Sequence, residues 1–166
     1  MHPCELPDRQ LLTDCDVRRQ RRSGPGGQHR NKVESAIVLV HRPSGVRAEA
    51  TERRNQHENR RVALKRLRLE LALDLRSERP PDGIPTSRWT TRAKQGAFRV
   101  DPQHEDFAPL LAEALDVIEQ QHYDVAAAAR SLRISSSQLI RFLKLEPRAL
   151  RMVNQTRQSM GLHRLH

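Results

Sequence analysis

A chain of 166 residues with 36% hydrophobic and only 3% aromatic residues suits one domain or two small ones and excludes one large core. The formal net charge of +10 indicates an anionic partner, either nucleic acid or an anionic membrane surface.

The two cysteines lack metal-ligand spacing and fit a reducing compartment. No apolar run approaches the roughly 20 residues that span a bilayer. The early acidic residues fit poorly with a secretory signal. We therefore expect a cytoplasmic protein with no membrane partner.

The charge is unevenly distributed along the chain. Residues 1–100 hold 22 Lys and Arg against 12 Asp and Glu. Residues 101–129 hold no basic residue and 7 acidic ones, and residues 130–166 hold 8 basic residues and 1 acidic one. Two basic regions therefore flank an acidic segment, and this block pattern favours a binding partner over merely solvated faces.

The first half of the chain is predicted to contain a small sheet and one long helix. Residues 15–20 suit a short edge strand, and the glycines of residues 23–28 indicate a loop. The β-branched run at 36–40 predicts a strand. A turn at Arg42-Pro43-Ser44-Gly45 and alternating residues up to 51 complete a hairpin. From about 57 to 76, apolar positions at helical spacing and a basic face predict a helix.

The second half is predicted to be helical. Residues 79–103 look irregular and basic, and the helices are expected at 107–122, 125–132, 136–143 and 147–160. Asp124 and Ser135 suit N-caps, and Pro147 suits a first helical turn. We therefore expect a domain at 1–78, a basic linker at 79–103 and an all-α domain at 104–166, in an α+β chain.

The glycine-rich loop is the main candidate for chemistry. Gly24, Gly26 and Gly27 permit backbone conformations that other residues resist, and they allow close approach to another surface. A phosphate cradle is a weak interpretation, because no Gly-Lys-Ser/Thr ending follows. The loop offers no nucleophile, metal cluster or paired carboxylates, so we expect no metal and no cofactor. Its partner must therefore supply part of any catalytic equipment.

Several separated motifs resemble the catalytic domain of peptide chain release factors. The resemblance covers roughly residues 12–78. It rests on Ser23-Gly24-Pro25-Gly26-Gly27-Gln28-His29-Arg30-Asn31-Lys32, Ser35-Ala36, His41, Pro43-Ser44-Gly45, Arg54-Asn55-Gln56 and Asn59-Arg60. It implies a small α+β domain in which a short mixed β-sheet packs on the helix of residues 57–76.

The resemblance also implies an activity. The Gly-Gly-Gln loop would enter the peptidyl transferase centre of the large ribosomal subunit and promote attack of water on the peptidyl-tRNA ester. Gly26, Gly27 and Gln28 are then the catalytic residues. The Gln28 backbone amide would donate a hydrogen bond where negative charge develops, and its side chain would admit water selectively. Gln28 is also a candidate for N5-methylation of its side-chain amide.

Basic and polar residues around the loop are the candidate contacts to ribosomal RNA and tRNA. Arginine suits this role because its planar guanidinium can hold a phosphate through two hydrogen bonds. The candidates are Arg21, Arg22, Arg30, Asn31, Lys32, Arg53, Arg54, Arg60 and Arg61.

The C-terminal region carries a second signal. Residues 125–143 resemble a helix-turn-helix of the bacterial regulator type, with Ser135-Ser136-Ser137-Gln138 opening the second helix. Arg133 stands where such turns usually have glycine. A plain helical bundle therefore remains the alternative interpretation.

Two functions follow from these patterns. Full-length release factors carry a separate stop-codon-reading region, for which we find no room here. We therefore expect a monomeric, codon-independent release or ribosome-rescue factor whose partners are the ribosome and peptidyl-tRNA. The alternative is a nucleic-acid-binding regulator that keeps the loop without hydrolysis, with DNA as a less favoured partner of the C-terminal helices.

Overall fold

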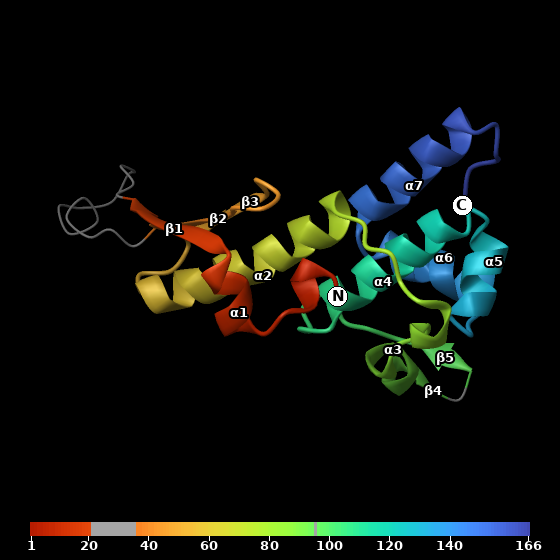
Figure 1. The fold of residues 1–166 in the computed structure, drawn as a ribbon, viewed down its shortest axis with the longest axis horizontal. Helices are drawn as coiled ribbons and strands as arrows, with labels where there is room; N and C mark the ends of the chain where they lie inside the picture. The colour runs from red at the N-terminus through yellow and green to blue at the C-terminus, as the bar shows by residue number, and fades with distance from the viewer. Residues whose placement is uncertain (21–35, 95) are drawn as a thin grey trace. The chain divides into compact units, whose positions relative to one another are not determined.

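The computed structural model describes residues 1–20, 36–94 and 96–166. These residues form an α+β protein, as expected, and they divide into two compact units (Figure 1). One unit is Pro3–Asp74, and the other joins Met1–His2 to Leu75–His166. None of the described helices is both long enough and apolar enough to cross a bilayer.

The unit Pro3–Asp74 is built on one three-stranded sheet. Its strands are β1 (Cys15–Gln20), β2 (Ala36–His41) and β3 (Arg47–Ala50), in the order β1-β2-β3. The chain enters the sheet through a short 3₁₀ helix, η1 (Pro3–Glu5), and α1 (Asp8–Thr13).

The sheet is antiparallel in both strand pairs, whereas we expected a mixed sheet. The short turn between β2 and β3 accounts for the antiparallel direction of that pair, because parallel neighbours need a long crossover connection. Gly45 has a φ of +73° in that turn, and its amide donates to the carbonyl of His41 at 2.7 Å. The hairpin predicted over 36–51 is confirmed.

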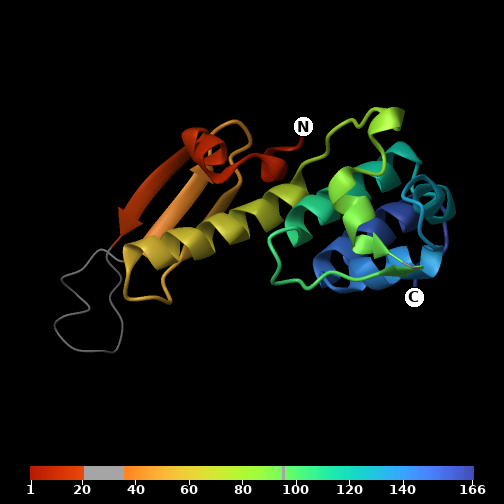
Figure 2. The same cartoon turned by 90° about the horizontal axis from the view of Figure 1, so that it is seen from below.

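The long helix α2 (Gln56–Asp74) packs on β2 and β3, as Figure 2 shows. Its buried apolar residues lie at helical spacing and include Ala63, Leu64, Leu67 and Leu71. They form one core with the sheet residues Leu39, Ala48 and Ala50 and with Leu11 of α1. The helix starts and ends within two residues of the range expected from the sequence.

The other unit contains four helices at the positions that apolar periodicity predicts. They are α4 (Phe107–Gln120), α5 (Val125–Ser131), α6 (Ser136–Lys144) and α7 (Pro147–Ser159). Asp124 caps α5, and Ser135 caps α6 through a capping box with Gln138.

Residues 79–103 hold more regular structure than the sequence indicates, which corrects the expectation of an irregular segment in part. They form η2 (Pro81–Gly83), α3 (Ser87–Arg92) and the antiparallel pair β4 (Ala93–Lys94) and β5 (Ala97–Phe98). Trp89 and Phe98 are buried and stack with ring centroids 4.3 Å apart, and Phe142 of α6 packs against both rings. This segment therefore belongs to the core of the helical unit.

Candidate nucleic-acid interface

One end of the three-stranded sheet gathers the residues that frame the candidate site. Gln20 pairs with Ala36, and Ile37 pairs with Ala50. The last residue of β1, the first of β2 and the last of β3 therefore lie at the same end of the sheet. Residues 21–35 join β1 to β2 at this end, and the turn 51–55 leaves β3 from it.

Most of the predicted site residues fall between β1 and β2. Gly26, Gly27 and Gln28, together with Arg21, Arg22, Arg30, Asn31 and Lys32, lie outside the residues that the structure describes. The structure does describe the paired strands on both sides of them. The segment between positions 20 and 36 therefore starts and ends at adjacent points of a paired sheet.

The turn 51–55 holds two of the predicted arginines. Arg53 and Arg54 are both exposed, and their side chains have no ion-pair partner among the described residues. Asn59 of α2 fixes the turn, because its side chain accepts from the Arg53 amide and donates to the Arg53 carbonyl, both at 2.9 Å. The Asn59 side chain is fully buried. Arg53 and Arg54 thus lie on a turn whose backbone is fixed by two hydrogen bonds to Asn59.

The one acidic residue of this turn is already neutralised. Glu52 forms an ion pair with Arg66 of α2, and the Arg66 hydrogen bond lowers the pKa of the Glu52 carboxyl. Arg66 also donates to the Glu49 carbonyl at 2.7 Å. Because Glu52 is engaged in this way, Arg53 and Arg54 remain available to an anionic partner.

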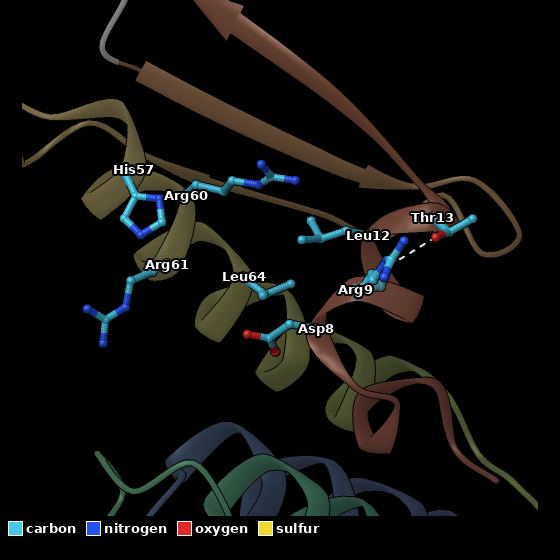
Figure 3. Close-up of a pocket in the computed structure, with 8 residues that line it drawn as sticks. All are labelled: Asp8, Arg9, Leu12, Thr13, His57, Arg60, Arg61 and Leu64. Carbon is cyan, nitrogen blue, oxygen red and sulfur yellow. Dashed lines mark hydrogen bonds between the residues drawn. The ribbon is translucent and has the colours of Figure 1, made fainter.

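A groove between α1 and α2 brings together the other two predicted arginines. It has a volume of about 520 Å³, and Figure 3 shows its lining: Asp8, Arg9, Leu12, Thr13, His57, Arg60, Arg61 and Leu64. Arg9, Arg60 and Arg61 are exposed and supply positive charge, while Leu12 and Leu64 supply apolar surface. Asp8 pairs with Arg68 at 2.6 Å, which offsets the only carboxylate of the lining. Cationic side chains beside apolar surface suit a partner that carries phosphate groups.

Two residues of this interface were missed from the sequence. Arg9 lies in a six-residue helix that has no visible periodicity, so nothing in the sequence places it beside α2. Asn59 belongs to the motif Asn59-Arg60, but the sequence indicates a binding role only for the charged residues beside it. A buried, twice-bonded amide becomes visible only once the turn 51–55 is seen to fold back on α2.

Other residues of the resembling motifs serve the scaffold. The Nδ1 atom of His41 lies 2.7 Å from the Ser44 hydroxyl, and that hydroxyl accepts from the Val46 amide at 3.3 Å. His41 is buried, and burial lowers the pKa of its ring. These contacts hold the β2–β3 turn. In the part of the chain that the structure describes, no cluster of His, Cys, Asp and Glu side chains could hold a metal ion.

Comparison with known proteins assigns a class to this fold and interface. The RF-1 domain family matches residues 11–104, and the chain belongs to that family. The matched range includes the three-stranded sheet, α2, residues 21–35 and the turn 51–55. Helices α4 to α7 lie beyond it.

The relatives are translation release factors. The chain is 52% identical over 58 residues to peptide chain release factor 1 of Xylella fastidiosa (strain 9a5c), covering 35% of this chain and 16% of that protein. It is 48% identical over 62 residues to peptide chain release factor 2 of Variovorax paradoxus (strain S110), covering 36% and 17%. The chain thus spans about a sixth of the length of these two relatives. No solved structure matches.

Proposed function

We propose that this protein promotes hydrolysis of the peptidyl-tRNA ester in the peptidyl transferase centre of the large ribosomal subunit. The observation that carries the proposal is the Gly26-Gly27-Gln28 sequence within the RF-1 match, between two strands that are paired at Gln20 and Ala36.

Within this proposal, each part of the interface has a separate task. The Gln28 amide would stabilise the developing negative charge, and the Gln28 side chain would select water. Gln28 would also be the site of N5-methylation. Arg53 and Arg54 in the turn, with Arg60 and Arg61 in the groove, would neutralise phosphates of ribosomal RNA or tRNA. The predicted contacts Arg21, Arg22, Arg30, Asn31 and Lys32 would act on the same RNA.

We further propose that release does not depend on reading a stop codon, which makes ribosome rescue the physiological role. The support is that helices α4 to α7 lie beyond the family match, and that residues 130–166 hold 8 basic residues against 1 acidic one. In this assignment residues 1–78 are the release domain, and residues 104–166, together with the segment 79–103 that packs into their core, direct the protein to its target. A cytoplasmic monomer without a cofactor suffices for the proposed reaction.

A variant of the loop tests the proposed hydrolysis. Gly27→Ala adds a Cβ where close approach is required, so peptide release should fall by at least about a hundredfold, the scale of losing one oxyanion donor. Binding to ribosomes, measured by co-sedimentation, should stay within about twofold of the wild type, because the basic residues are untouched. Full release by Gly27→Ala on ribosomes that hold peptidyl-tRNA would exclude the proposal.

The second candidate is a nucleic-acid-binding regulator that keeps the loop domain without hydrolysis. Its support is that residues 125–143 resemble a helix-turn-helix and form two short helices, α5 and α6. Tight DNA binding by the purified protein, together with failure to associate with large ribosomal subunits, would favour this candidate over the first.

A further inference from the structure

Helices α5 and α6, the segment that resembles a helix-turn-helix, are joined by a tight turn. Helix α5 ends at Ser131, and Arg133 adopts a left-handed conformation with a φ of +55°. The Ile134 amide donates back to the Ala129 carbonyl at 3.0 Å, which closes the turn. A capping box then starts α6: the Gln138 amide donates to the Ser135 hydroxyl at 3.1 Å, and the Ser135 amide donates to the Gln138 side chain at 2.8 Å.

On one side of α6, Gln138 in the first turn is already engaged by another part of the same unit. The side-chain amide of Gln138 donates to the carbonyl of Gly96, in the turn between β4 and β5. Phe98 of β5 and Phe142 of α6 pack edge to face, with ring centroids 5.1 Å apart. A helix-turn-helix reads DNA bases with the N-terminal residues of its second helix. Here the β4–β5 turn lies against that end of α6, which disfavours base reading.

The outer face of α6 remains open and is cationic. Ser137, Arg141 and Lys144 follow one another at spacings of four and three residues, so they share one side of the helix. All three are exposed, and neither Arg141 nor Lys144 has an ion-pair partner among the described residues.

The acidic residue nearest in sequence to this face does not neutralise it. Glu146 caps α7 through the Arg148 amide at 3.2 Å and pairs with the Arg148 guanidinium at 2.9 Å. It is also the only acidic residue in 130–166, against 8 basic ones. A hydroxyl and two cations on one side of a helix can donate hydrogen bonds to phosphates and neutralise their charge.

We propose that the outer face of α6, formed by Ser137, Arg141 and Lys144, binds the phosphate backbone of double-helical RNA without reading its sequence. Backbone binding follows from the open cationic face and the engaged first turn. The choice of RNA over DNA rests on the proposed ribosomal function. This face would give the protein a second RNA contact, separate from the loop domain.

A charge-removal experiment on the full chain tests this surface. The double variant Arg141→Gln/Lys144→Gln is compared with Arg151→Gln/Arg164→Gln, which removes the same charge from exposed residues that also lack an ion-pair partner among the described residues. Binding to a labelled RNA hairpin is measured by fluorescence anisotropy over a range of salt concentrations. The α6 double variant should bind about tenfold more weakly and lower the slope of log affinity against log salt by about 2. The control should change the affinity by less than about twofold.

Three results would overturn the inference. Equal weakening by the two double variants would show that only total charge matters. A shared sequence among RNAs selected from a random pool would show base reading. Tighter binding to duplex DNA of the same sequence would contradict the choice of RNA. The Gly27→Ala variant separates this surface from the release activity, because it should bind the hairpin like the wild type even if the proposed hydrolysis fails.

Discussion

At the scale of single residues, Asn59 links α2 to the turn that carries Arg53 and Arg54. Asn59→Ala would leave the amide and carbonyl of Arg53 without their partner in a site where the Asn59 side chain is fully buried. Losing such a partner costs about 1–3 kcal/mol. We therefore expect amide hydrogen exchange in residues 47–55 to accelerate by about tenfold or more, as measured by mass spectrometry.

Asn55→Ala is the matched control for this prediction. Asn55 lies in the same turn but is exposed, and its side chain accepts from the His57 amide at 2.7 Å. Its loss should therefore have the smaller effect. Similar acceleration in both variants would contradict the assigned role of Asn59.

Arg133 shows what the sequence left open at this scale. An arginine where such turns usually have glycine left a plain helical bundle as the alternative. In the structure Arg133 has a φ of +55°, and this left-handed conformation costs a non-glycine residue about 1–2 kcal/mol. The caps at Asp124 and Ser135 were predictable from residue type, whereas the backbone angle of Arg133 was not, because neighbouring helices decide it.

At the scale of elements, long periodic segments were predictable and short ones were not. The hairpin, α2 and the four helices α4 to α7 follow from apolar spacing over several turns or from alternation. Helices α1 and α3 have six residues each, and β4 and β5 have two each, which is too short for a period to show. Contacts between distant residues, such as the Trp89–Phe98 stack, determine them instead.

The N-cap of α5 makes this element sensitive to acid. Hydrogen bonds from the Ala127 and Ala126 amides lower the pKa of the Asp124 carboxyl below its ordinary value of 3.8. Because the pKa of Asp124 is lower in the folded state than in the unfolded state, the stabilisation is fully present above the unfolded pKa. It is lost as the pH falls through the folded pKa. The ionised cap thus stabilises α5 at neutral pH.

Asp124→Asn tests this account, since asparagine caps a helix without titrating. Between about pH 6 and pH 3, the urea midpoint followed by the fluorescence of Trp89, the single tryptophan, should fall further for the wild type than for Asp124→Asn. Both proteins share every other titrating group. Equal losses in the two proteins would show that the Asp124 charge contributes nothing to this unit.

At the scale of the whole molecule, the charge blocks of the sequence do not translate directly into surface charge. Residues 101–129 are acidic in sequence, yet two of their seven carboxylates, those of Glu113 and Asp116, are buried in the helical unit. Glu113 accepts from the Thr86 amide and hydroxyl, at 2.7 and 2.6 Å, and Asp116 pairs with Arg79 at 2.8 Å. Burial raises the pKa of Asp116. The surface of the helical unit is therefore less acidic than the charge count of residues 101–129 suggests.

The sequence predicts the motifs of the candidate site but not the tertiary contacts that complete it. The motifs around Gly26-Gly27-Gln28 and Arg54-Asn55-Gln56 indicate a release-factor domain because several separated short motifs occur in order. The sequence does not say that α1 lies beside α2, which is what places Arg9 in the groove with Arg60 and Arg61. Tertiary contacts of this kind leave no local pattern.

The central claim is that the protein releases peptides from tRNA on the ribosome without reading a stop codon. The most direct test measures peptide release from purified ribosomes that hold peptidyl-tRNA, with a stop codon, a sense codon or no codon in the A site. We predict that release without a codon is at least as fast as release at a stop codon. Release at the stop codon alone, or no release in any of the three states, would contradict the account.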